Sequence, residues 1–308
     1  MAVTIAIANE KGGVGKTTTA VNLAAGLALR LSALPGADGR VLLVDMDPQA
    51  HGLLATAYDQ HMAHQQSGSD SDSLATLLTE SPPPSALRLI KRGDHHPNLF
   101  FIPTSRQSMV DAARLLPTLM ANETRLSRAL TPLQDQFRYI IIDTPPTIGD
   151  LLVNALVAST HVVVPVGTSY LGVSGLRELQ RTIEQVRVHF RTDLQILGYL
   201  PTLCEEQRSE AQEILEELQN RYPGLVFPPI HKSSDLAYAH SSHMDVFTFR
   251  PPRSRRGENI ASSSRPTQEY AHLVELVLER TKPQRARSRS TAQAAQRNQG
   301  NKGETGRK

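Results

Sequence analysis

The sequence has few of the residues that build covalent, metal-based or aromatic sites. Among 308 residues there is one cysteine, Cys204, and no tryptophan. The chain therefore cannot form an internal disulfide or, by itself, a cysteine-built metal or iron–sulfur site. Aromatic residues make up only 5%, which argues against a carbohydrate-binding or aromatic-cage protein. No apolar run approaches the roughly 18 to 20 residues that cross a bilayer, and the opening MAVTIAIAN lacks the basic segment of a secretory leader. We expect a soluble protein of a reducing compartment.

Positive charge is concentrated in the last segment of the chain. The formal net charge is +3. From Arg280 to Lys308 there are nine lysines or arginines and one glutamate, a local charge of +8, whereas the preceding residues carry −5. Because this last segment also has almost no apolar side chains, it cannot bury enough surface to fold. We expect one folded domain over 1–281 and a basic, disordered tail over 282–308.

Short apolar runs alternate with segments of helical periodicity. This alternation predicts an α/β fold with a mostly parallel, twisted sheet and helices on both faces. Ligands of such folds bind at the carboxyl ends of the strands. The strand candidates are 3–8, 41–45, 99–103, 139–143, 161–166 and 194–200. The helix candidates are 17–31, 108–119, 123–136, 172–190 and 209–221.

Three segments depart from this alternation. Residues 58–98 are polar and rich in Ser, Asp and His, and we expect a surface excursion with one short helix near 74–78. Residues 250–267 have the composition of a basic, flexible loop. After this loop, apolar residues over 267–280 are spaced as on one face of a helix. The eleven histidines lack acidic or cysteine companions at metal-ligand spacing, and we interpret them as solvated loop residues.

A glycine-rich segment joins the first strand to the first helix and has the composition of a phosphate-binding loop. Glycines allow backbone N–H groups to turn towards an anion, and the following helix adds unpaired N–H groups and a positive dipole end. Lys16 would meet the β- and γ-phosphates, and the Thr17 hydroxyl would ligate Mg²⁺. The nucleotide-binding residues predicted here are Lys11, Gly12, Gly13, Val14, Gly15, Lys16, Thr17 and Thr18.

This loop differs from the ordinary P-loop pattern, since Glu10 stands where glycine is usual and Lys11 adds a second lysine. KGGVGKTT resembles the deviant P-loop of the ParA/MinD family of ATPases, and the chain is most similar to the short ParA type that partitions chromosomes or small plasmids. The resemblance implies a P-loop NTPase fold, ATP and Mg²⁺ as ligands, and a homodimer that forms on ATP binding. It also implies that Lys11 contacts phosphates bound by the other subunit, where its charge would stabilise phosphoryl transfer.

Two acidic strand ends match the same family. VLLVDMDPQ contains Asp45 and Asp47, and RYIIIDTPPT contains Asp143. The resemblance implies that Asp47 orients the attacking water and helps to hold Mg²⁺, and that Asp143 is the Walker B carboxylate beside the metal. Thr144–Pro146 would form a switch that senses the γ-phosphate. The predicted catalytic residues are Lys11, Lys16 and Asp47, and the predicted metal-binding residues are Thr17, Asp47 and Asp143.

Further matches to the family, later in the chain, concern contacts with the adenine base and with DNA. Pro201 and His231 occupy positions that border the adenine in the family, although the family usually has proline where this chain has His231. Arg208 and Lys232 lie near positions through which the family binds DNA non-specifically. The resemblance covers residues 1–250.

The function that this resemblance implies is ATP-dependent DNA partitioning. An ATP-bound dimer would coat nucleoid DNA in the cytoplasm, and a ParB-like partner would stimulate hydrolysis and release. The basic tail would strengthen DNA binding by neutralising phosphates.

The sequence leaves three alternatives open. A ParA-like ATPase could position another cargo. A MinD-like protein would cycle on membranes through an amphipathic helix, but the polar face of 267–280 carries three glutamates that anionic lipids repel. A relative of the nitrogenase iron protein would need two cysteines in each chain, and this chain has one.

Overall fold

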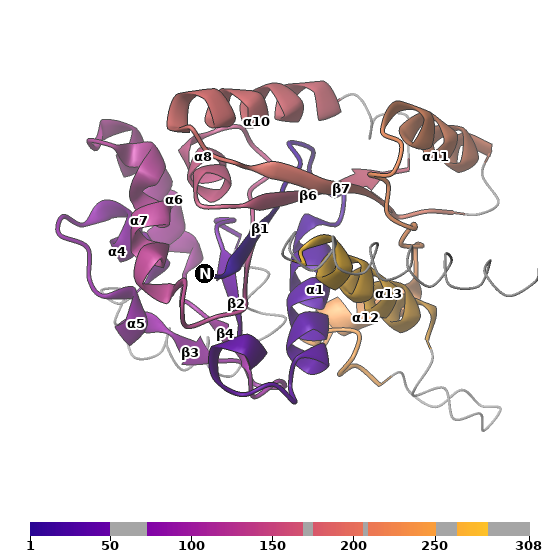
Figure 1. The fold of residues 1–308 in the computed structure, drawn as a ribbon, viewed down its shortest axis with the longest axis horizontal. Coiled ribbons are helices and arrows are strands. Elements are labelled where there is room, and N and C mark those ends of the chain that lie inside the picture. The colour runs from indigo at the N-terminus through magenta and orange to yellow at the C-terminus, as the bar shows by residue number, and fades with distance from the viewer. Residues whose placement is uncertain (50–72, 169–174, 206–208, 251–263, 283–308) are drawn as a thin grey trace, which may run out of the picture.

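The computed structural model describes residues 1–49, 73–168, 175–205, 209–250 and 264–282. Within these residues the chain forms a sheet of seven strands in the order β3-β4-β2-β5-β1-β6-β7 (Figure 1). Neighbouring strands are parallel except β3 and β4. The strands are β1 (Val3–Ile7), β2 (Val41–Asp45), β3 (Lys91–Arg92), β4 (Leu99–Phe101), β5 (Tyr139–Asp143), β6 (His161–Gly167) and β7 (Gln195–Thr202). The α/β fold and the six expected strands are confirmed.

The central strands are apolar because both of their faces are covered. β2 and β5 are buried along their whole length. β5 lies between β1 and β2, and its last residue, Asp143, pairs with Ile7 on one side and Asp45 on the other. The carboxyl ends of these three strands therefore meet at one edge of the sheet, where the glycine-rich loop and both acidic segments begin.

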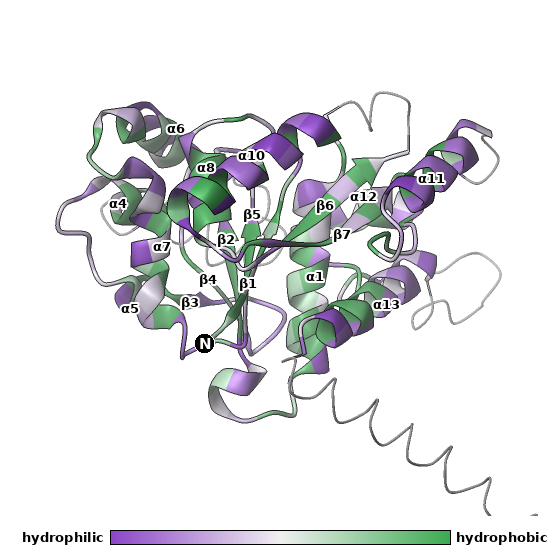
Figure 2. Ribbon diagram, turned by 45° about the horizontal axis from the view of Figure 1, so that its top comes forward, coloured by the Kyte–Doolittle hydropathy of each residue, from purple (hydrophilic) through white to green (hydrophobic). Residues whose placement is uncertain are grey.

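Helices cover both faces of the sheet. α1 (Lys16–Arg30) and α13 (Arg265–Arg280) lie side by side on one face, and α4, α6, α7, α8 and α10 cover the other (Figure 1). Figure 2 shows hydrophobic strands at the centre and polar surfaces along α10 and α11. The remaining helices are α4 (Leu74–Thr79), α5 (Ala86–Leu89), α6 (Arg106–Leu115), α7 (Arg125–Leu130), α8 (Asp150–Val157), α10 (Leu176–Phe190), α11 (Ser209–Arg221) and α12 (Ser234–Ser241).

The expected helix over 123–136 is wrong as a single element. The chain there forms a 3₁₀ turn at Asn122–Thr124, then α7, then a second 3₁₀ turn at Thr131–Leu133. Pro132 lies in the first turn of that last segment, where it has no N–H for a continuing α-helix. The elements that the sequence did not indicate, β3, α5, α8 and α12, are eight residues long at most.

The described part of the expected surface excursion, 73–98, includes a helix that belongs to the core. It contains α4, which confirms the expected short helix, but Leu74, Leu77 and Leu78 of this helix are at most 1% exposed. These leucines recur at helical spacing and pack in one core cluster with α6 and α7. The earlier part of the expected excursion, 58–72, lies outside the described residues.

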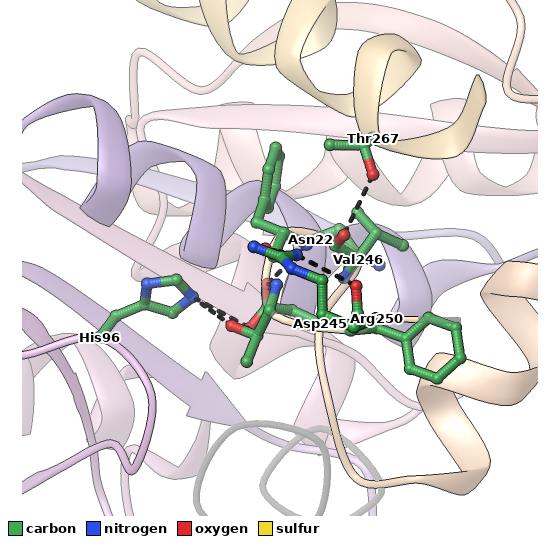
Figure 3. A network of polar contacts seen from close by, with 9 residues as sticks. Asn22, His96, Asp245, Val246, Arg250 and Thr267 are labelled. Atoms are coloured by element: carbon green, nitrogen blue, oxygen red, sulfur yellow. Dashed lines mark hydrogen bonds and ion pairs between the residues drawn. The ribbon is translucent and has the colours of Figure 1, made fainter. Parts of the chain in front are cut away.

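Asp245 lies in a polar network between α12 and α13 (Figure 3). Its carboxylate is 3.0 Å from Nε2 of His96, in the segment before β4. The next backbone N–H, of Val246, donates to Asn22 of α1 at 2.8 Å, and the Val246 carbonyl accepts from Thr267 of α13 at 3.0 Å. The network therefore joins two helices to the sheet. His96 is 9% exposed, so the expectation of a solvated histidine is wrong here.

The helix α13 packs against α1 through its apolar stripe. It begins at Arg265, within the expected loop 250–267; residues 251–263 and 283–308 lie outside the described residues. No helix in the described ranges is long and apolar enough to cross a membrane. The buried residues of the α13 stripe are Tyr270, Leu273, Val274 and Val277.

Candidate nucleotide-binding site

The loop between β1 and α1 closes around Lys16. Gly13 and Gly15 have φ angles of +72° and +80°, a region in which a side chain is strained. Lys16 is 6% exposed, and its ammonium donates to the Lys11 carbonyl at 2.8 Å. The loop therefore holds a positive charge at the N-terminus of α1, which is the geometry of an anion site.

Two buried side chains outside the predicted set of site residues hold this loop in place. Asn9 donates to the Pro165 carbonyl of β6 at 2.6 Å and accepts from the Lys11 N–H at 3.0 Å. Thr202, the last residue of β7, donates to the Val14 carbonyl at 2.8 Å. β6, which pairs with β1, and β7, which pairs with β6, therefore set the shape of the loop. The only sequence signal for these residues is their position at carboxyl ends of strands.

Charged side chains interact at the shared carboxyl edge of β1, β2 and β5. Burial lowers the pKa of Lys16, whereas the carboxylates of Asp143 and Asp47 raise it. Burial also raises the pKa of Asp143 well above its usual range, and the Asp45 carboxylate adds to this, while the Thr17 hydroxyl and Lys16 act against it. Buried carboxylates that lie close together repel each other when they are ionised. A cation bound at this edge of the sheet would therefore be stabilised.

Asp143 fits a magnesium site. It is fully buried, and within the described residues neither of its carboxylate oxygens has a hydrogen-bond partner of normal geometry. Buried polar atoms are rarely left unpaired, and carboxylate oxygens are ligands that Mg²⁺ prefers. The described residues contain no group of three His, Cys, Asp or Glu side chains that could hold a metal. A magnesium ion here would therefore complete its coordination with phosphate oxygens and water, as is usual for Mg²⁺.

Asp47 lies in the turn directly after β2. Its N–H donates to Asp45 at 3.0 Å, and its own carboxylate accepts from the Gln49 N–H at 2.9 Å. The half-buried side chain borders a cavity of about 320 Å³ between this turn and the Pro145–Leu151 segment after β5. The carboxylate is therefore fixed in direction and still reached by water.

A second cavity of about 320 Å³ adjoins the start of α1 and is bordered by α12 and α13. Gly15 and Thr18 line it on the side of the phosphate-binding loop, and His231 lines it on the other side. Pro201 is buried in β7 and does not line the cavity, whereas its neighbour Thr202 does. The structure therefore brings one of the two expected base-contacting residues to this cavity.

Of the two expected DNA contacts, one lies in the described residues. Lys232 borders the second cavity, and its ammonium is 2.9 Å from the carboxylate of Glu205. Arg208 lies outside the described residues.

β1, a central strand of the sheet, runs into this two-lysine loop, and β2 and β5 end in acidic residues beside it. This arrangement defines a P-loop nucleoside triphosphatase. Residues 2–196 match a family model described as an AAA domain. The chain is 35% identical over 254 residues to the sporulation initiation inhibitor protein Soj of Bacillus subtilis, covering 82% of this chain and 93% of Soj. It is also 35% identical over 231 residues to the chromosome partitioning protein ParA of Myxococcus xanthus, covering 73% of this chain and 74% of that protein. The chain belongs to the ParA/MinD family of ATPases and is close to the Soj-like partitioning proteins.

Solved structures share this fold. Cobyrinic acid a,c-diamide synthase from Mycobacterium smegmatis, with a bound ATP analog and magnesium, is 28% identical with a TM-score of 0.69, covering 92% of this chain and 96% of that chain. A plasmid partition protein from Borrelia burgdorferi, bound to AMPPNP, has a TM-score of 0.71 at 21% identity, covering 91% of this chain and 99% of that chain. The second likeness concerns the fold alone.

Proposed function

We propose that this chain is a DNA-partitioning ATPase that hydrolyses ATP to ADP and phosphate and acts as an ATP-dependent homodimer. The observation that carries the proposal is the loop with two lysines, in which Lys16 is held against the Lys11 carbonyl at 2.8 Å and interacts with Asp143 and Asp47. The names of the relatives, which include a chromosome partitioning protein, support the cellular role.

Each residue of the site would have a separate task. Lys16 and the N–H groups of its loop would hold the β- and γ-phosphates, and Thr17 and Asp143 would hold Mg²⁺. When bound, Mg²⁺ neutralises charge on the phosphate oxygens and polarises the transferred group. Asp47 would accept a hydrogen bond from the attacking water and align it, since a fixed carboxylate beside an open cavity suits this role.

Lys11 would complete the site of a second protomer. Its backbone is fixed, because its N–H donates to Asn9 and its carbonyl accepts from Lys16. Within the described residues its ammonium has no hydrogen-bond or ion-pair partner. Because this ammonium is carried by a rigid loop and has no partner among the described residues, it is suited to contact phosphates bound by another chain. Nucleotide binding and dimerisation would then depend on each other.

The ATP-bound dimer would bind nucleoid DNA non-specifically, and a ParB-like partner would stimulate hydrolysis and so release the DNA. The proposed DNA contacts are Arg208, Lys232 and the basic tail. The local charge of +8 after residue 279 supports binding to a polyanion, because neutralising phosphates releases counterions.

The membrane alternative has little support from α13. A helix that enters the lipid interface needs an unpartnered apolar face, but the apolar stripe of α13 is buried against α1. Its glutamates are also engaged within the protein, since Glu269 contacts His231 and Glu275 contacts Arg30. A different cargo would leave the nucleotide site unchanged and remains the second candidate.

DNA co-sedimentation would test the proposal. We expect binding to non-specific DNA with Mg²⁺ and ATP, weak binding with ADP or without nucleotide, and a marked loss of binding between two salt concentrations. Lys16→Ala should bind neither nucleotide nor DNA in the ATP condition, because the phosphates lose their main cationic partner. Equal DNA binding in all three nucleotide conditions would contradict the proposal.

A further inference from the structure

The histidine in the cavity next to α1 is held by a residue from far along the chain. Nδ1 of His231 lies 2.6 Å from Oε1 of Glu269, and the backbone N–H of His231 donates to Oε2 of the same carboxylate at 2.9 Å. The two side chains are only 13% and 16% exposed. Because one carboxylate contacts both the ring and the backbone of His231, the ring has a fixed orientation at the cavity wall.

Glu269 is itself anchored in α13. Arg265, one helical turn earlier, donates to Oε1 of Glu269 at 2.7 Å. The next residue, Tyr270, is 1% exposed and also lines the cavity. The carboxylate therefore cannot turn away without breaking three hydrogen bonds beside a buried part of the helix.

This contact also determines where the imidazole carries its proton. A carboxylate only accepts hydrogen bonds, so Nδ1 of His231 is the donor. In the neutral ring, the opposite nitrogen, Nε2, is then an acceptor. An acceptor is complementary to the 6-amino group of adenine and repels the 6-oxo group of guanine.

We propose that Glu269 is a positioning residue for base recognition, which holds His231 in the orientation and tautomer that favour adenine over guanine. This inference rests on the proposed ATPase function. Both residues lie beyond the 2–196 segment that matches the family model.

Calorimetric titration with Mg²⁺ and three ligands, ATP, GTP and inorganic tripolyphosphate, would test the proposal. In Glu269→Ala the preference for ATP over GTP should fall about tenfold, the value of one well-placed hydrogen bond. Affinity for tripolyphosphate, which has no base, should stay the same. The matched control is Glu275→Ala, in the same helix, because Glu275 makes an exposed contact with Arg30 at 2.6 Å and does not line the cavity.

Two further variants distinguish positioning from a general loss of structure. Glu269→Gln keeps the size of the side chain but can donate to Nδ1, so it should also lower the preference for ATP in a protein that thermal unfolding shows to be folded. His231→Ala should lower the preference by the same factor as Glu269→Ala, and the double variant should lower it no further. An unchanged ratio of ATP to GTP affinity in both Glu269 variants would overturn the inference and leave the ATPase proposal intact. A wild-type protein that bound none of the three ligands would overturn both.

Discussion

Two buried carboxylates of this protein have opposite surroundings. Within the described residues Asp143 has no hydrogen-bond partner of normal geometry for either oxygen. Asp245 is 1% exposed, and although burial alone would raise its pKa, hydrogen bonds from His96 and Thr248 lower the pKa below its usual value. A buried carboxylate without hydrogen-bond partners of normal geometry is suited to binding a cation, whereas one that already accepts hydrogen bonds is suited to a permanent structural contact.

Replacing Asp245 should therefore destabilise the fold in a way that depends on pH. At pH 7 we expect Asp245→Asn to lower the free energy of unfolding by about 3 kcal/mol, because a buried charge-assisted contact is broken. The pKa of Asp245 is lower in the folded than in the unfolded chain, so its contribution is present above about pH 4 and is lost as the pH falls through the folded value. Urea unfolding of both proteins at pH 7 and pH 3.5 would measure this difference, which should shrink on acidification.

The control for this experiment is Asp111→Asn. Asp111 is exposed and lies 3.6 Å from Arg114, and such a surface pair should change the free energy of unfolding by less than about 1 kcal/mol. A loss at Asp245 that stayed constant with pH would show that the ionised carboxylate is not the stabilising species.

At the scale of elements, the local sequence pattern predicted the central strands of the sheet but not the short helices beside the site. The apolar runs of β1, β2 and β5 predicted the central strands, because residues buried on both faces leave a continuous signal. α8 and α12 are eight residues each, shorter than the window in which helical periodicity can be recognised. α4 was expected at the surface because the polar segment before it dominated the local composition.

The same distinction applies to the site residues. Lys16, Asp47 and Asp143 stand in motifs that can be read within ten residues of sequence. Asn9 and Thr202 act through partners 156 and 188 residues away, and His231 meets Glu269 across 38 residues. No local pattern encodes such pairs, because only the folded sheet and the packing of α13 bring them together.

The close approach of α1 and α13 gives a prediction for an element contact. A Cβ atom at Gly26 of α1 would lie 2.7 Å from Val274 of α13 and 2.9 Å from Phe247. Gly26→Val should therefore lower the free energy of unfolding by about 2 kcal/mol through overpacking. Urea denaturation would measure this, with Leu29→Val as the control, since Leu29 is 51% exposed on the same helix and should change stability by less than about 0.5 kcal/mol. Equal effects of the two substitutions would show that the helices can move apart at no cost.

At the scale of the whole molecule, the proposed dimer can be separated from nucleotide binding. Lys11→Ala should still bind Mg²⁺–ATP, because Lys16 and the loop N–H groups remain. It should stay monomeric and not hydrolyse ATP, because the phosphates lose the charge from the second protomer. Size-exclusion chromatography with light scattering, with and without ATP, would measure the mass, and wild-type protein under the same conditions is the control. A variant that dimerised fully with ATP would remove the role proposed for Lys11.

The last described turn of the chain lies at the end of β5 that is remote from Asp143. Thr281, directly after α13, contacts the hydroxyl of Tyr139 at 2.7 Å, and Tyr139 is the first residue of β5. A strand of five residues spans roughly 17 Å. The described chain thus ends at the rim opposite the phosphate-binding loop, so two protomers that met face to face over that loop would leave Thr281 of each outside their contact.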